Sequence, residues 1–319
     1  MNFRIVLKTL GVLAILIGLT MAACWGYAAW VASQTRGTPL DISARDALGL
    51  STGITIGFGI ALYLFGIRCK PELLRREAML IVGLAWVEVS LLGMLPYALC
   101  EQGLPVFDAI FESVSGFTTT GSTILTDIEA FPEAILLWRS VTQWLGGIGI
   151  LVVFVAVLSF LGVGSRSLVA NESSLNINDA RTSRIRDIAF TLLKVYLALS
   201  AICFVGLFFL GMPTFEAVCH AMCTIATGGF SPKNASVGHY DHVGIEMWIS
   251  LFMFLSSIGF MLYVFLLTGN WKRLRSEEEA RYFFLLVVIA VLAIGLDLML
   301  ASTHFGYRKA LRDGFFNVV

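Results

Sequence analysis

The stretch FDAIFESVSGFTTTGST, residues 107–123, begins with the apolar spacing of a short amphipathic helix and ends in a run rich in threonine and glycine. A related stretch, FEAVCHAMCTIATGGFSP, follows at 215–232. When their first phenylalanines are aligned, Phe-Asp-Ala-Ile matches Phe-Glu-Ala-Val, and Gly121 and Gly229 both fall fourteen positions later. Both stretches lie between long apolar runs. We interpret them as two copies of one unit, in which a half-helix leads into a Thr/Gly turn.

The composition indicates a polytopic helical membrane protein. The 319 residues are 57% hydrophobic and 14% charged, whereas soluble domains carry about 25% charged residues. The net charge is zero, which gives no reason to expect a nucleic-acid partner, and we expect membrane lipid around the protein instead. The six cysteines lie mostly in or beside apolar runs, without the spacing of a disulfide framework. We therefore interpret them as packing residues.

Seven apolar segments are long enough to cross a bilayer, which takes about 20 residues for about 30 Å of hydrocarbon. They cover roughly 5–32, 47–67, 77–100, 132–163, 186–211, 244–269 and 281–303. The first is predicted to be an uncleaved helix, because it exceeds the roughly 7–15 apolar residues of a signal peptide. Lys and Arg are concentrated in the loops after the second, fourth and sixth segments, and cytoplasmic loops are the ones enriched in them. We predict a cytoplasmic N-terminus and Thr/Gly turns on the outside.

The repeat divides the chain into four parts. Two N-terminal helices occupy 1–70, the first helix–pore-loop–helix repeat 71–170 and the second 171–275. A third repeat begins at 276–319, and the sequence stops before its turn would arrive. The two complete repeats have the same orientation. This favours a channel-like ring over a carrier built from inverted repeats.

The turns have the chemistry of a cation site. Irregular backbone at membrane depth is tolerated where it lines a cavity, and main-chain carbonyls can replace the hydration shell of potassium. The C-terminal end of each half-helix carries roughly −0.5 charge, which favours a cation. The turns lack Asp and Glu, so binding would be weak enough for release. Asp127, Glu129 and Glu133 follow the first turn and would raise the cation concentration at an outer mouth.

Four motifs resemble one family of proteins. They are FESVSGFTTTGSTIL (111–125), LLWRSVTQWLGGIGILV (136–152), LGVGSRSLVANESS (161–174) and ATGGFSPKNASVG (226–238). Together they resemble the TrkH/KtrB/HKT superfamily of potassium transporters, most of all its bacterial TrkH-type branch. The resemblance implies an all-α membrane fold with four tandem helix–pore-loop–helix repeats around a potassium-channel-like pore, preceded in this branch by two extra helices.

The resemblance also implies a selectivity filter and its ion. The filter residues would be Thr118, Thr119, Thr120, Gly121 and Ser122 in the first repeat and Ala226, Thr227, Gly228 and Gly229 in the second. Potassium would contact mainly the carbonyls of Thr119, Thr120, Thr227 and Gly228. A serine at the position of Gly121 accompanies sodium preference in the plant branch, so the glycine here implies potassium. Glu112 and His220 occupy matching positions, and we expect both to support the filter.

The function implied by the resemblance is potassium uptake across the cytoplasmic (inner) membrane by the translocating subunit of a Trk-type system. It also implies a homodimer and a separate cytosolic TrkA-type regulatory subunit, which would hold a nucleotide, NAD or ATP. We expect no cofactor in this chain beyond K⁺. Two alternatives stay open: a secondary cation carrier working by sodium- or proton-coupled symport, and a truncated fragment that does not conduct, because two filters of four are absent.

Other sequence features suggest competing readings. An intramembrane enzyme would need a nucleophile–base pair or a metal cluster, and no H-E-x-x-H motif occurs, so we expect no enzymatic activity. The run CHAMC at 219–223 suggests zinc, but a structural site needs about four ligands, and packing is the preferred interpretation. We interpret Arg139 as a structural residue with Glu133 or Glu129 as its candidate partner, and we predict that WLGGIGI at 144–150 serves close helix packing.

Overall fold

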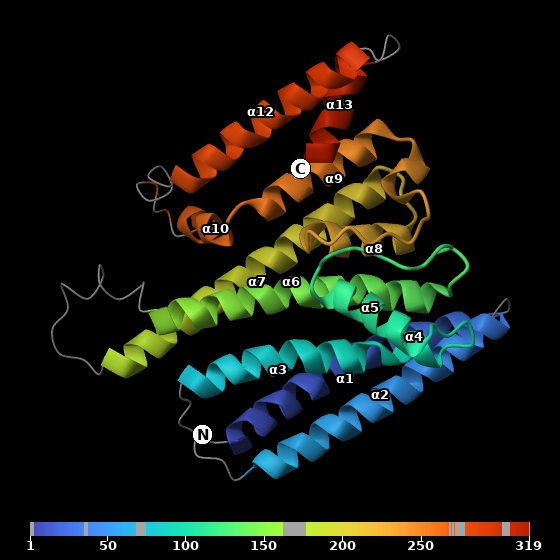
Figure 1. Cartoon of the computed structure of the whole chain (residues 1–319), viewed down its shortest axis with the longest axis vertical. Helices are drawn as coiled ribbons and strands as arrows, with labels where there is room; N and C mark the ends of the chain where they lie inside the picture. Colours follow the sequence, from blue (N-terminus) through green and yellow to red (C-terminus); the bar gives the residue numbers. More distant parts are fainter. Residues whose placement is uncertain are drawn as a thin grey trace. The chain divides into compact units, whose positions relative to one another are not determined.

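The computed structural model describes residues 3–34, 38–67, 75–161, 177–267, 269, 271, 278–301 and 307–318. Within these residues the regular elements are helices (Figure 1). Five described helices are long and apolar enough to cross a membrane: Phe3–Ser33, Pro39–Gly66, Arg76–Leu99, Ala189–Phe209 and Ala280–Asp297. The chain groups into two units, one of residues 1–164 with 228–236 and the other of 165–227 with 237–319.

The first unit is built from six helices within its described residues. They are α1 (Phe3–Ser33), α2 (Pro39–Gly66), α3 (Arg75–Gly93), α4 (Leu95–Leu99), α5 (Val106–Phe117) and α6 (Glu133–Leu161). α1 and α2 pack along each other (Figure 1). A Cβ atom on Gly11 would lie 2.6 Å from the carbonyl oxygen of Gly59, so these glycines allow the close backbone approach that membrane helices favour.

The start of α2 lies earlier than the sequence predicted. The expected start was near residue 47, whereas the helix begins at Pro39. Thr38 caps it: its hydroxyl accepts from the Asp41 N–H at 3.2 Å, and the Asp41 carboxylate accepts from the Thr38 N–H at 2.9 Å. This capping box and a proline at the first helical position are a strong helix start.

The predicted span 77–100 contains a break. α3 ends at Gly93 and α4 begins at Leu95, because Pro96 has no N–H to continue the ladder of hydrogen bonds. The Trp138 indole N–H on α6 donates to the carbonyl of Gly93 at 3.0 Å. The break is therefore satisfied from the neighbouring helix.

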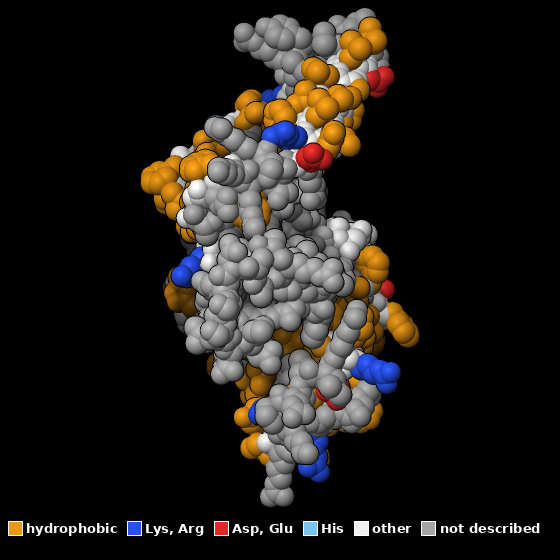
Figure 2. All heavy atoms as spheres, turned by 90° about the vertical axis from the view of Figure 1, so that its left-hand side faces the viewer, with side chains coloured by type: hydrophobic (Ala, Val, Ile, Leu, Met, Phe, Trp, Pro, Cys, Tyr) orange, Lys and Arg blue, Asp and Glu red, His pale blue; other side chains and the backbone are white. Residues whose placement is uncertain are grey.

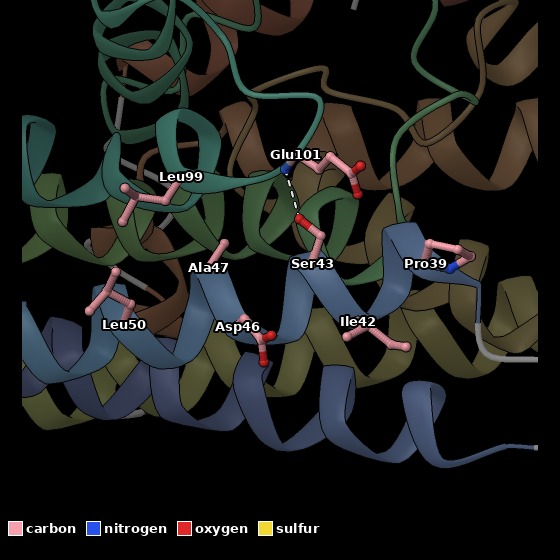
Figure 3. A pocket seen from close by; sticks show the side chains of 8 residues that line it. All are labelled: Pro39, Ile42, Ser43, Asp46, Ala47, Leu50, Leu99 and Glu101. Carbon is pink, nitrogen blue, oxygen red and sulfur yellow. Dashed lines mark hydrogen bonds between the residues drawn. The ribbon is translucent and has the colours of Figure 1, made fainter.

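A surface pocket of about 460 Å³ lies between the start of α2 and the residues at the end of α4 (Figure 3). Across it, the Glu101 N–H donates to the Ser43 hydroxyl at 2.7 Å. This bond fixes the segment that leads into α5 against α2. α5 itself packs against α3 and α6, and Phe117 at its end meets Trp138 edge to face at 6.2 Å in the buried core.

The second unit contains α7 (Ile177–Phe209), α8 (Thr214–Ile225), the 3₁₀ helix η2 (Ser236–Tyr240, beginning in the first unit), α9 (Val243–Ser257), α10 (Phe260–Leu267), α12 (Glu278–Ala301) and α13 (Tyr307–Val318). α8 packs against α7 and α9, and α13 packs against α9 and α12. A Cβ atom on Gly206 would overlap the Trp248 ring, whose N–H donates to the Cys203 carbonyl at 3.1 Å. α7 and α9 therefore lie in close contact.

The predicted span 244–269 is wrong as a single helix. α9 ends at Ser257 and α10 begins at Phe260, because Ile258 takes an extended conformation with ψ 135. The Tyr263 hydroxyl donates to the Leu255 carbonyl at 2.6 Å. One carbonyl released by the break is thus bonded again.

Large apolar side chains reach the surface along the long helices. Leu16, Phe58, Phe209 and Leu300 are between 45% and 81% exposed, and Figure 2 shows apolar side chains on the face that it views. Such exposure is the expected state of side chains that contact lipid, because lipid tails are themselves apolar.

Candidate functional site

The two half-helices predicted from the repeat are present. α5 (Val106–Phe117) and α8 (Thr214–Ile225) each have 12 residues. Pro105 and Pro213, 108 positions apart like the aligned phenylalanines, stand before them with φ −50 and −52. Because proline fixes φ near −65°, both half-helices start from the same backbone geometry.

The first half-helix ends in a tight C-terminal cap. The Thr119 N–H donates to the Gly116 carbonyl and the Thr120 N–H to the Ser115 carbonyl, both at 3.0 Å. Thr119 holds a left-handed backbone with φ 54. This pattern is a Schellman motif, whose left-handed position is usually glycine. A β-branched residue there is an outlier that persists only where the surroundings hold it.

The second half-helix repeats one bond of this cap and its left-handed residue at matching positions. The Thr227 N–H donates to the Thr224 carbonyl at 3.1 Å, and Thr227 has φ 53. Two residues later in each turn, Gly121 and Gly229 have φ 78 and 88. The two turns therefore share their backbone conformation as well as their sequence pattern.

The caps leave the turn carbonyls without donors. Among the described residues, no hydrogen bond is made to the carbonyls of Thr118 to Gly121 or of Thr227 to Gly229. The N–H groups of Thr118, Thr119 and Thr120 are all bonded to carbonyls of the half-helix. Each turn thus presents bare carbonyl oxygens at the negative end of a helix, which is an arrangement that suits a cation.

Gly121 brings the two loops together within the first unit. A Cβ atom on Gly121 would overlap the carbonyl oxygen of Gly228, and its φ of 78 disfavours any side chain. A Cβ atom on Gly228 would in turn overlap the side-chain amide of Gln143. Glycine at both positions permits this contact of backbone with backbone.

The expected partner of Arg139 is wrong. Its Nε and Nη2 atoms both lie 2.8 Å from Oε1 of Glu112, not beside Glu129 or Glu133. The two side chains are 1% and 0% exposed. Glu133 instead accepts from the Tyr27 hydroxyl at 2.7 Å. Glu129 and Glu133 are closer to Arg139 in the sequence, but the turn of α5 that carries Glu112 faces the start of α6.

Glu112 also contacts the residues just after the first turn. Its carboxylate accepts from the Thr123 hydroxyl at 2.9 Å and from the Ile124 N–H at 3.3 Å. His220, at the matching position of α8, is buried and meets the Tyr240 ring edge to face at 5.6 Å. Burial lowers the pKa of His220 to about 4, against the opposing effect of the Glu216 carboxylate. The matching positions thus hold an ion pair in one repeat and a neutral imidazole in the other.

The outer parts of the two loops are joined by Asn234. Its side chain accepts from the Ile128 N–H at 2.7 Å and donates to Asp127 at 2.9 Å, and its own N–H donates to Glu129 at 3.1 Å. Lys233 lies 3.8 Å from the Glu129 carboxylate. Asp127 and Glu129, two of the three acidic residues expected at an outer mouth, therefore fasten one loop to the other.

Comparison with known proteins gives the family. The sequence model of TrkH, described as a cation transport protein family, matches residues 54–304. The chain belongs to the TrkH family. The Trk system potassium uptake protein TrkH of Halomonas elongata is 35% identical over 332 residues, and that of Escherichia coli strain K12 is 35% identical over 326 residues. Each match covers 100% of this chain and 65% of the relative, so the chain spans just under two thirds of their length.

A solved structure gives the fold of this TrkH-family chain. The crystal structure of the potassium transporter TrkH from Vibrio parahaemolyticus matches with a TM-score of 0.84 and 31% identity, covering 100% of this chain and 64% of that one. This confirms an all-α, multi-pass membrane fold. Because the family is one of cation transporters, the expectation of a non-enzymatic protein agrees with it. The motif at 161–174 lies outside the described residues except for Leu161.

The structure of this TrkH-family chain also shows the surroundings of the remaining residues that the sequence singled out. Ser122 accepts from the Ser115 hydroxyl through its carbonyl, and Ala226 ends α8. Cys219 and Cys223 are buried, and neither forms a disulfide with a described residue. Packing is confirmed for WLGGIGI at Gly146, where a Cβ atom would overlap the carbonyl oxygen of Phe117.

Sequence reasoning missed Gln143. Its side-chain oxygen accepts from the Phe230 N–H at 3.1 Å, and its side chain is fully buried. The sequence contained a usable indication, because Arg139 and Gln143 stand one turn apart in a predicted spanning segment. Polar residues inside a spanning helix are functional candidates.

Proposed function

We propose that this TrkH-family chain supplies two segments of a potassium selectivity filter and serves as the translocating part of a Trk-type uptake system. The observation that carries the proposal is the paired turn: a left-handed threonine and a left-handed glycine at matching positions, with carbonyls that receive no donor from the described residues. Such oxygens can replace the hydration shell of an ion without a fixed charge that would trap it.

The residue roles follow from this arrangement. Potassium contacts the carbonyls of Thr119, Thr120, Thr227 and Gly228, and the half-helix ends add their negative partial charge. Glu112 and His220 support the two turns from behind. An ion in a carbonyl cage needs oxygens from several sides, and the two described loops provide part of them.

The setting of the filter is proposed from family membership. It is the cytoplasmic (inner) membrane, with a cytoplasmic N-terminus, in a homodimer. A separate cytosolic TrkA-type subunit holds the regulatory nucleotide, NAD or ATP. The relatives from Halomonas elongata and Escherichia coli are named as Trk system proteins, which supports a system of more than one component.

Uptake by cells tests the function. The protein as its host makes it is expressed in cells that lack their own potassium uptake systems, and growth at low potassium and rubidium uptake are measured. We expect both to be restored relative to cells carrying an empty vector. If the protein reaches the membrane in normal amount together with its host's regulatory subunit, and neither growth nor uptake recovers, the proposal is wrong.

A further inference from the structure

Arg139 on α6 contacts the first loop through an ion pair that is buried completely. Its Nε and Nη2 atoms lie 2.8 Å from the Glu112 carboxylate, and Nη2 also donates to the Thr123 hydroxyl at 3.2 Å. Thr123 follows the filter stretch directly. The guanidinium therefore holds the residue at which the first turn leaves the filter.

The same guanidinium also contacts the second loop. Its Nη1 atom donates to the Ser231 carbonyl at 3.2 Å, and its central carbon lies 4.1 Å from the centre of the Phe230 ring. One turn further along α6, Gln143 accepts from the Phe230 N–H. The two polar side chains of α6 therefore bind the segment that follows Gly228 and Gly229.

The cost of this arrangement indicates a specific role. Burying two charges costs several kcal/mol per ion before their attraction offsets it, and apolar side chains could fill the same space. The cost of a buried ion pair is tolerated where the groups that it holds must keep an exact geometry. Here the five donors of one rigid fork reach both loops at once, which the single ammonium group of lysine cannot do.

We propose that Arg139, assisted by Gln143, is a positioning residue that fixes the first and second filter segments relative to each other and thereby sets the preference for potassium over sodium. The contact that it holds is the one between Gly121 and the Gly228 carbonyl. The left-handed Thr119 of the first turn needs external support to persist. This inference rests on the proposed function, because it assigns a cause to the selectivity of that same filter.

The test compares substitutions that keep charge or size. In the protein as its host makes it, Arg139→Lys and Gln143→Met are examined with Arg45→Lys as the matched control. Arg45 forms an ion pair with Asp46 on the exposed surface of α2. Membrane abundance, rubidium uptake and the ratio of potassium to sodium uptake are measured for each variant.

We expect Arg139→Lys to lower the ratio of potassium to sodium uptake roughly tenfold, a change equivalent to about 1.4 kcal/mol, with abundance within about twofold of the wild type. Gln143→Met lowers the ratio less, and Arg45→Lys leaves it unchanged. If Arg139→Lys fails to reach the membrane, Gln143→Met decides the outcome. The inference is overturned if the variant that reaches the membrane has the wild-type ratio of potassium to sodium uptake. It is also overturned if abundance and uptake fall while that ratio is unchanged.

The two proposals fail in different ways. If the wild-type protein itself does not distinguish potassium from sodium, the proposed function is wrong, and the inference that rests on it is wrong as well. If the wild type is selective and the Arg139 and Gln143 variants are equally selective, the inference about positioning alone is wrong.

Discussion

Thr119 and Thr227 hold left-handed backbones at positions where glycine is the usual residue. A left-handed residue with a side chain costs roughly 1–2 kcal/mol, and here the strain falls at matching positions of the two turns, 108 positions apart. The surrounding bonds resist its relaxation, since the half-helix carbonyls accept the N–H groups on both sides in the first turn. Strained residues that recur in this way cluster at functional sites.

At Gly146 the spacing of helices is set by the absence of a side chain. In Gly146→Ala the new methyl group would overlap the Phe117 carbonyl, and overpacking of this kind costs about 1–3 kcal/mol. We expect a lower midpoint of thermal unfolding and reduced rubidium uptake. Gly57→Ala is the control, because a Cβ atom there meets nothing within 4 Å. Equal midpoints for the two variants would contradict the close contact.

His220 makes stability depend on pH. Its pKa is lowered to about 4 in the folded protein, whereas an unfolded histidine titrates near 6.5. Between these values the unfolded state binds more protons, so the stability present above pH 6.5 is lost as the pH falls towards 4. Thermal unfolding of His220→Gln should therefore change less over this window than that of the wild type. His239→Gln, at an exposed residue, serves as the control, and parallel curves for all three proteins would refute the burial.

At the scale of the element, the break between α9 and α10 is closed by one side chain. In Tyr263→Phe the Leu255 carbonyl loses its 2.6 Å bond, which is partly buried, and a typical hydrogen bond contributes about 0.5–1.5 kcal/mol to stability. We expect a lower unfolding midpoint in detergent. Tyr282→Phe is matched to it, because Tyr282 is 68% exposed. A midpoint equal to that of this control would show that the bond is not needed.

The half-helices could be predicted from sequence and the helix breaks could not. The sequence predicts the first half-helix as 107–117, close to the observed α5 (Val106–Phe117), and the repeat places a second one where α8 is found, because local spacing determines such helices. The interruption near Ile258 and the pairing of Arg139 with Glu112 depend on which elements meet in space. Hydropathy is averaged over a window of residues, so it does not reveal the interruption near Ile258. A single sequence contains no direct sign that Arg139 pairs with Glu112.

At the scale of the whole molecule, the orientation in the membrane stays a prediction from the distribution of Lys and Arg. Cysteines introduced as Gly238→Cys and Glu278→Cys, both at exposed residues, test it in intact cells. A thiol reagent that does not cross membranes should label the first and not the second, with the unsubstituted protein as background. Labelling of the second and not the first would invert the topology.

The proposed filter is tested most directly by ion selectivity across a membrane. The protein as its host makes it is reconstituted in a bilayer with potassium on one side and sodium on the other, and the reversal potential is measured for the wild type and for Gly121→Ser. The account predicts a potential near that of potassium for the wild type, and a clear shift towards sodium for Gly121→Ser, because the added side chain would collide with the Gly228 carbonyl. A wild-type protein that does not distinguish the two ions, or a variant whose potential is unchanged, would contradict it.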